Sequence, residues 1–154
     1  MKHIFRLLLI VLAATACKEV YDTPPQSLAQ INLYDIDTES SKSTLTSVKG
    51  ANMDSIWIDG ETASYFQLPF DQSGMATFIV LLDSVADTLI ISYNSGLAYE
   101  SMESGFYTEH DIQWVSSTRN KIDSISLIDT LVTTIWHENI QLYLNDSTAY
   151  SSSN

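Results

Sequence analysis

The sequence predicts an all-β domain in which two antiparallel sheets pack face to face, preceded by a cleaved export signal. Apolar residues after position 27 recur mostly at every second position, which is typical of half-buried strands. No segment after Cys17 combines a 3.6-residue apolar period with helix caps, so we expect little helix. Turn signals separate the short apolar runs, and strands without helical connections indicate a sandwich or a partly closed barrel.

The first sixteen residues have the features of a secretory signal peptide. Lys2 and Arg6 are the basic residues of this segment, and an apolar run of Leu, Ile, Val and Ala leads to small residues before Cys17. The run is shorter than the about twenty apolar residues that span a bilayer. We therefore expect residues 1–16 to be removed as a signal peptide and not to remain as a transmembrane helix.

Cys17 is the expected site of lipidation. The sequence Ala14-Thr15-Ala16-Cys17 resembles the lipobox of bacterial lipoproteins, which implies cleavage before Cys17 and acylation of its sulfur and amine by chains such as palmitate. The alternative is a secreted protein whose one cysteine lies near the cleavage site. Cys17 is the only cysteine, so it cannot form an internal disulfide, and a free thiol is a liability in an oxidising compartment.

Lys18 and Glu19 resemble the signal that sends Bacteroidota-type lipoproteins to the outer face of the outer membrane. Only one acidic residue follows the lysine directly, and the alternative is a solvated tether with incidental charges. We expect a lipid-anchored protein of the outer membrane, on its periplasmic face or on the cell surface. The membrane, contacted through the acyl chains on Cys17, is the first expected partner.

The chain divides into a signal peptide (1–16), a lipidated tether (17–27), a β-sandwich domain (28–146) and a polar tail (147–154). The whole sequence has 19 acidic and 7 basic residues, a net charge of −12. Removal of the signal leaves 138 residues with 5 basic and 19 acidic residues, a net charge of −14. This acidity excludes nucleic acid as a partner, because phosphate contacts need clustered Lys and Arg.

The expected strands follow the tether in order. The run at 78–82 is apolar at every position, which favours a central strand covered on both faces. The other segments alternate, which favours an immunoglobulin-like or jelly-roll-like antiparallel β-sandwich. The strand segments are 31–36, 56–58, 66–70, 78–82, 89–93, 125–127 and 140–144.

The alternation also predicts which side chains form the core. These are the aliphatic and aromatic residues on one phase of each segment. They are Ile31, Leu33, Ile56, Ile58, Phe66, Leu68, Phe78, Val80, Leu89, Ile91, Ile125, Leu127, Ile140 and Leu142.

A recurring tripeptide of Asp, then Ser or Thr, then an aliphatic residue predicts strand starts, because Asp and Ser side chains bind nearby backbone in turns. A reading of these aspartates as calcium ligands is disfavoured, since no two have the spacing of a calcium loop. The tripeptide occurs at 54–56, 83–85, 87–89, 123–125 and 129–131.

Asp35, Asp37 and Glu39 are the candidate metal ligands. Alternate acidic residues place three carboxylates on one side of an extended segment, and oxygen ligands suit calcium. The spacing is not that of an EF-hand. The alternative is a charged turn after the first strand, and no other cofactor is expected.

Trp57, Trp114 and Trp136 are the candidate ligand-contact residues. Their rings could stack on sugars or pack against a protein partner. The alternative is that each of them fills space between the two sheets.

Catalysis is not expected. His110 precedes Asp111, but neighbours on a strand point to opposite faces, so this is no base–carboxylate pair. His137 begins a His-Glu sequence in which Gln141 stands where a zinc helix needs its second histidine. No Gly-x-Ser-x-Gly sequence surrounds any serine.

Several segments together resemble a family of short, uncharacterised Bacteroidota-type lipoproteins that share a domain of unknown function. Where Ser104 stands, that family tends to carry a cysteine, so no disulfide of the relatives is implied here. The resemblance implies location and fold, and no activity. The matching segments are 31–35, 67–71, 87–93, 104–106, 120–125 and 139–143.

We therefore expect a lipid-anchored cell-envelope protein that acts as a non-enzymatic interaction or accessory module of the outer membrane, with an envelope protein or a glycan as partner. The alternative is a calcium-stabilised binding domain for a glycan or protein ligand.

Overall fold

The protein was examined as a computed structural model, which describes residues 26–102 and 104–145. These residues form ten strands and no helix, so none of them provides a helical membrane span. The strands are β1 (Leu28–Asp35), β2 (Thr44–Gly50), β3 (Ile56–Ala63), β4 (Tyr65–Pro69), β5 (Met75–Leu82), β6 (Val85–Ser101), β7 (Gly105–Ser117), β8 (Ile122–Leu127), β9 (Leu131–Val132) and β10 (Glu138–Leu144).

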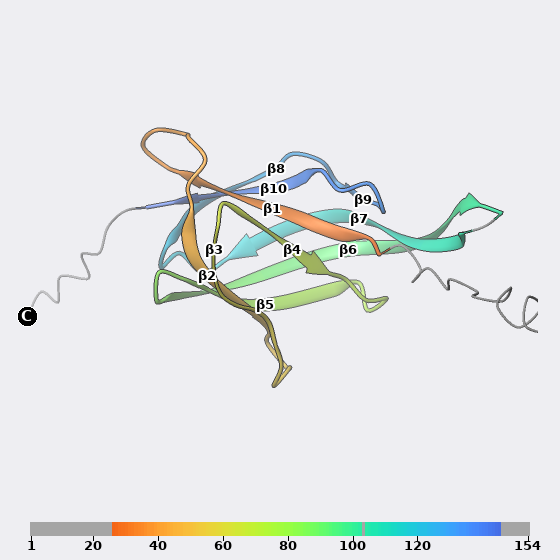
Figure 1. Cartoon of the computed structure of the whole chain (residues 1–154), viewed down its shortest axis with the longest axis horizontal. Coiled ribbons are helices and arrows are strands. Elements are labelled where there is room, and N and C mark those ends of the chain that lie inside the picture. Colours follow the sequence, from red (N-terminus) through yellow and green to blue (C-terminus); the bar gives the residue numbers. More distant parts are fainter. Residues whose placement is uncertain (1–25, 103, 146–154) are drawn as a thin grey trace, which may run out of the picture.

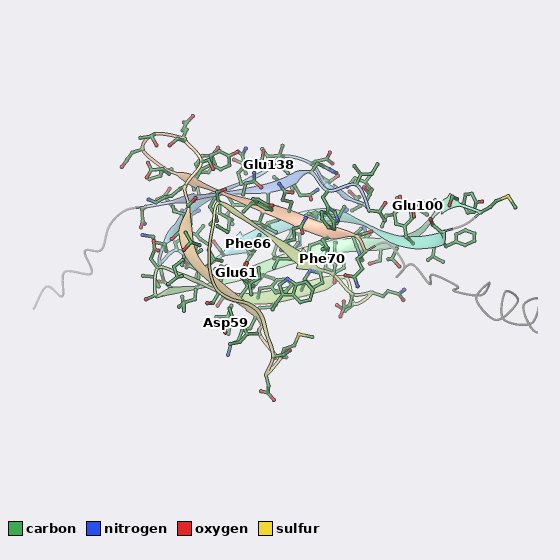
Figure 2. The ribbon with its side chains drawn as sticks, viewed as in Figure 1. Asp59, Glu61, Phe66, Phe70, Glu100 and Glu138 are labelled. Carbon is green, nitrogen blue, oxygen red and sulfur yellow. The ribbon has the colours of Figure 1, made fainter. Side chains whose placement is uncertain are left out.

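The strands form two packed sheets, which confirms the predicted all-β sandwich. One sheet has the order β4-β1-β10-β8, and the other has the order β3-β2-β5-β6-β7-β9. Figure 1 shows the two layers and the long β6–β7 hairpin that projects from one end of the sandwich. The side chain of Phe66 on β4 is buried in the core (Figure 2).

One strand pair departs from the antiparallel expectation. β1 and β10 are parallel, with Leu33 opposite Leu142, whereas all other pairs of strands are antiparallel among the described residues. The first and last strands thus lie side by side in the middle of the four-stranded sheet. Ile31, Leu33, Ile140 and Leu142 are fully buried, as their alternation predicts.

Most of the predicted core is confirmed, and two members are wrong. Ile56 is exposed because a register shift in the β2–β3 pairing places it opposite the exposed Lys49, and Leu127 is exposed at the last position of β8, an edge strand. Ile58 and Ile125 are partly buried and pack against the core. The core residues that the alternation did not predict are Ala29, Val48, Leu82, Tyr93, Ile112, Ile122, Val132 and Leu144.

The apolar run of β5 is covered on one face only. Phe78, Val80 and Leu82 are buried, but Leu81 is exposed, so the prediction of cover on both faces is wrong. A two-layer sandwich has no third layer to lie over this strand. The outer apolar residues of β5 remain on the surface of the six-stranded sheet.

The strands β2 and β7 carry no clear apolar alternation. In β2, Thr44 and Thr46 point inward and are buried, while Leu45 is exposed. In β7, the inner phase includes the buried His110 beside Ile112. Polar residues on the inner face conceal the period-two pattern, so neither strand was expected from the sequence.

Three of the five Asp tripeptides mark strand starts as predicted, at the first residues of β3, β6 and β9. The tripeptides that begin at Asp87 and Asp123 lie inside β6 and β8, so that prediction is wrong for both. The reason is clear for Asp87, whose carboxylate serves a distant segment and not its own turn.

Asp87 is buried and joins the two sheets. Its Oδ1 accepts hydrogen bonds from Thr118 Oγ1 (2.7 Å) and from the Asn120 amide (2.8 Å). Its Oδ2 accepts from the amides of Lys121 (2.8 Å) and Ile122 (3.0 Å). Four donors on the connection from β7 to β8 are therefore satisfied by one carboxylate on β6.

We expect Asp87→Asn to lower the free energy of unfolding by about 2–4 kcal/mol, because an amide nitrogen would face donors and leave buried groups unsatisfied. Urea denaturation measures the loss. Asp129→Asn is the control, because its carboxylate is half-exposed: Oδ1 accepts one hydrogen bond from the Leu131 amide, and Oδ2 lies 3.2 Å from His137 Nε2 at the surface. Equal losses in the two variants would contradict the role of Asp87.

Candidate functional site

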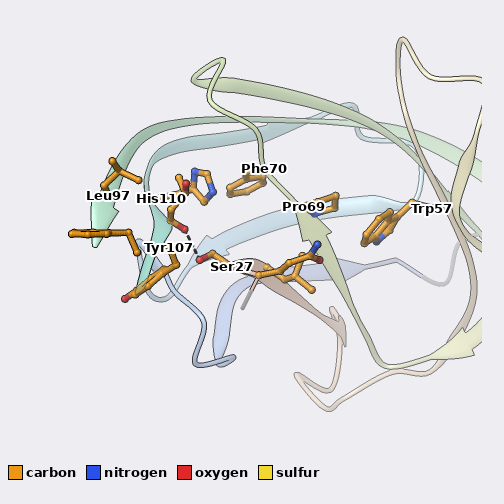
Figure 3. Close-up of a pocket in the computed structure, with 11 residues that line it drawn as sticks. Ser27, Trp57, Pro69, Phe70, Leu97, Tyr107 and His110 are labelled. Carbon is orange, nitrogen blue, oxygen red and sulfur yellow. Dashed lines mark hydrogen bonds between the residues drawn. The ribbon is translucent and has the colours of Figure 1, made fainter. Parts of the chain in front are cut away.

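A cleft of about 500 Å³ opens at the end of the sandwich where β1 begins. It lies between β4 and the β6–β7 hairpin, and Trp57 of β3 borders it (Figure 3). The lining residues are Gln26, Ser27, Leu28, Trp57, Pro69, Phe70, Leu97, Phe106, Tyr107, Thr108 and His110.

Backbone contacts fix the walls of the cleft. Ser27 Oγ donates a hydrogen bond of 2.5 Å to the Thr108 carbonyl, which ties the entry to β1 against β7 (Figure 3). Trp57 Nε1 donates to the Gln67 carbonyl (2.8 Å), which holds its indole beside β4. Segments that are distant in sequence therefore bound the cleft, and these two hydrogen bonds hold the entry to β1 and the Trp57 indole in place.

An aromatic cluster forms the inner wall. The rings of Phe70 and Tyr93 stack with centroids 4.4 Å apart and an interplanar angle of 6°. His110 presents its ring edgewise to both, at 5.5 Å from Phe70 and 5.3 Å from Tyr93. Such offset and edge-on contacts are the favoured geometries of aromatic pairs. The buried imidazole is therefore packed as part of an aromatic wall.

Polar groups lie behind this wall, since Asp71, Tyr93 and Ser95 contact it but do not line the cleft. His110 Nδ1 lies 2.9 Å from Ser95 Oγ, its direct cross-strand partner, and Tyr93 Oη donates to Asp71 Oδ1 (2.9 Å). Burial lowers the pKa of His110, which keeps the imidazole neutral at pH 7, and burial raises the pKa of Tyr93. Hydrogen bonds from Ser73 lower the pKa of Asp71. One carboxylate thus stays charged beside a neutral phenol and a neutral imidazole.

The Ser95–His110 pair has part of the geometry of a nucleophile and its base. In a triad, a carboxylate binds the other imidazole nitrogen, but the Asp71 Oδ1 accepts from the Tyr93 hydroxyl. Among the described residues, no hydrogen bond of a carboxylate to His110 is found. The arrangement fixes the ring and is suited to presenting an aromatic surface.

The three tryptophans lie at different places. Trp57 is 49 % exposed and lines the cleft, and Trp136 is 57 % exposed with its Nε1 3.4 Å from the Gln26 carbonyl. Trp114 is 46 % exposed and lies on β7 of the six-stranded sheet, opposite Ser92 of β6. None of them fills the space between the sheets. The structure brings two of the three to the end where β1 begins.

The acidic candidates follow β1 at the opposite end of that strand. Asp35 forms an ion pair with Lys42 (3.0 Å) and accepts hydrogen bonds from Thr38, and these contacts lower its pKa to about 2. Asp37 donates its amide to Asp35, and Glu39 has a positive φ of 52°. No group of three or more His, Cys, Asp or Glu residues in 26–102 and 104–145 is arranged to hold a metal ion.

Calcium at Asp35, Asp37 and Glu39 stays a prediction, and it would require the Asp35–Lys42 ion pair to open. Cys17 and the signal peptide lie outside the described residues, so lipidation stays a prediction as well.

The sequence did not point to most of the cleft. The alternation predicts only a strand at Phe70, and it gives no signal for Ser95, Leu97 or Tyr107. The sequence held one signal of the cleft: a polar segment follows Tyr93, and it extends β6 beyond the residues that alternate between apolar and polar. Pairing of Ser95 with His110 depends on the hairpin register, which has a shift between Ser92 and Tyr93.

Comparison with known proteins identifies the family. Residues 44–144, about two thirds of the chain, match a family of unknown function (DUF6452), and the chain belongs to that family. No curated protein and no solved structure matches the chain.

We expect stability to fall between pH 7 and pH 5, and His110→Gln to reduce this fall. Burial holds the folded pKa of His110 below its ordinary value of 6.5, so the unfolded chain binds the proton more readily. The stabilisation is complete above 6.5 and is lost as the pH falls, by at most about 1.4 kcal/mol per pH unit.

Thermal unfolding at several pH values measures this dependence. His137→Gln is the control. This variant should keep the loss of stability between pH 7 and pH 5 that protonation of His110 causes. An unchanged slope in His110→Gln would contradict the assignment.

Proposed function

We propose that the protein is a lipid-anchored cell-envelope protein, held in the outer membrane at Cys17, whose β-sandwich acts as a non-enzymatic interaction module. The observation that carries the interaction role is the aromatic cleft at the end of the sandwich. The proposal places the protein among Bacteroidota-type lipoproteins, on the basis of the sequence around Cys17 and Lys18-Glu19. It leaves open which face of the membrane the protein occupies.

The sequence supports the anchor. A basic and apolar leader ends in small residues before the one cysteine, and the folded domain begins about ten residues later at Leu28. Several acyl chains on one residue give firm attachment, whereas one chain alone anchors only marginally.

The cleft supports a ligand that is uncharged and has apolar faces. Its eleven lining side chains include no acidic or permanently basic group, and His110 is neutral at pH 7. Trp57 and Tyr107 offer aromatic faces, and Gln26 offers amide groups. This combination suits the sugar rings of an envelope glycan, which present apolar faces and hydroxyl groups together. A protein segment of the same polarity is the alternative ligand.

A binding role agrees with the geometry of His110. Its Nδ1 is occupied by Ser95, and its ring edge is packed on Phe70 and Tyr93. These contacts stabilise the wall of the cleft and leave the imidazole as part of the binding surface.

We expect Cys17→Ala to abolish incorporation of labelled palmitate and to move the protein from the membrane fraction to the soluble fraction. The acyl chains are the attachment, so their loss removes it. Thr23→Ala, a change in the tether that keeps the thiol, is the control and should behave as the unsubstituted protein. A Cys17→Ala protein that remains in the membrane fraction would refute the anchor.

We expect Trp57→Ala to weaken the binding of a neutral envelope oligosaccharide about tenfold or more, since a buried aromatic contact contributes roughly 1–2 kcal/mol. Calorimetric titration of the soluble Cys17→Ala protein gives the affinity. Trp114→Ala is the matched control, because this indole has nearly the same exposure but lies outside the cleft. Equal affinities in the two variants, or no binding at millimolar sugar, would sink the glycan assignment.

A further inference from the structure

The most exposed large apolar side chains gather at one end of the molecule. Among the described residues these are Met102 (95 % exposed), Ile135 (77 %), Leu97 (74 %) and Phe106 (66 %). A soluble domain usually shows such residues singly and scattered. Their concentration here indicates a surface that contacts something apolar.

Two segments build this surface. The first is the tip of the β6–β7 hairpin, where Tyr99 and Phe106 face each other across the strands with ring centroids 5.4 Å apart. The second is the loop between β9 and β10, which contains Ile135 and Trp136. Thr134 Oγ1 donates to Glu100 Oε1 (3.3 Å), which connects the loop to the hairpin. Figure 2 shows Glu100 on this projecting hairpin.

The tether enters the fold at the same end. Trp136 Nε1 contacts the Gln26 carbonyl, and Ser27 Oγ contacts the Thr108 carbonyl of β7. The nine Cα–Cα steps from Cys17 to Gln26 reach at most roughly 30 Å. β6 alone has 17 residues and is roughly 55 Å long. An acylated Cys17 therefore reaches this end readily and the far end of β6 only with difficulty.

The opposite end is charged and suits water. The turn between β5 and β6 carries Asp83, whose carboxylate lies 3.7 Å from Lys121 Nζ. The Asp35–Lys42 ion pair lies beyond the end of β1. The molecule thus has an apolar end beside its tether and a charged end away from it.

We propose that the apolar end, formed by Leu97, Tyr99, Met102, Phe106 and the Ile135-Trp136 pair, lies in the interfacial region of the bilayer that holds Cys17. This rests on the lipid anchor proposed above. Aromatic rings with one polar atom favour the boundary between headgroups and acyl chains. Glu100 beside the hairpin tip disfavours an anionic surface, so the preferred surface is zwitterionic.

The test uses the acylated full chain in phosphatidylcholine vesicles. Because acylation blocks Cys17, a cysteine introduced by Met102→Cys is the one free thiol and takes an environment-sensitive NBD fluorophore. Val85→Cys, at the first residue of β6 and so at the far end of the strand that leads to Met102, is the matched control. We expect blue-shifted emission and quenching by nitroxide-labelled phosphatidylcholine at position 102, and neither at position 85. Added phosphatidylglycerol should reduce both effects at position 102.

Palmitate labelling before reconstitution separates the two proposals. A chain without acyl groups refutes the anchor and the membrane contact together. An acylated chain whose label at position 102 emits as in water refutes the membrane contact alone. A blue shift that appears without lipid, rises with protein concentration and is insensitive to the nitroxide lipid assigns the surface to a second copy of the chain and likewise overturns the proposal.

Discussion

The burial of one carboxylate fixes how the two sheets meet. Asp87 extends from β6 of the six-stranded sheet to the connection that starts β8 of the four-stranded sheet, and it accepts four hydrogen bonds there. A buried charge is tolerated only when it is fully hydrogen-bonded. The requirement acts in both directions, because the amides of the connection need this acceptor as much as the carboxylate needs donors. The end of β7 and the start of β8 are thereby set, and β8 pairs with β10.

The parallel pairing of β1 with β10 links the position of β8, which Asp87 sets, to the position of the cleft. β10 lies between β8 and β1, so the position of β8 governs where β1 can pair. β1 in turn brings Gln26 and Ser27 to the projecting hairpin. The residues that line the cleft come from five different parts of the chain, and each is placed by the sheet to which it belongs. A cleft of this kind depends on the whole sandwich and not on a local motif.

The sequence predicted the fold class because period-two alternation depends only on one face being apolar. It predicted segments of β1, β3, β4, β5, β6, β8 and β10, which carry alternating or continuous aliphatic and aromatic residues. It did not predict β2 or β7, because Thr44, Thr46 and His110 occupy inner positions where an apolar residue was expected. Local side-chain patterns also could not distinguish Asp87 from a turn aspartate, since its partners are more than thirty residues away.

The same limit applies to the cleft. Stacking of Phe70 on Tyr93 and contact of Trp57 with Gln67 join the end of β4 to strands of the other sheet, and no short segment of the sequence shows how two sheets pack together. Trp114 was a candidate ligand contact like the other two tryptophans, yet its exposure comes from the outer face of the sheet and not from the cleft.

The proposed anchor and the proposed membrane contact together define where the cleft opens. Leu97 and Phe106 belong both to the hairpin surface and to the wall of the cleft. If the hairpin tip lies among the lipid headgroups, the cleft opens at the membrane surface and not into bulk solvent. Its ligand would then be held close to the bilayer, as a membrane-linked glycan is. The ion pairs of Asp35 with Lys42 and of Asp83 with Lys121 would lie away from the lipid. The most exposed apolar side chains are thus concentrated at the end that carries the tether, and this concentration gives an anchored domain a defined orientation.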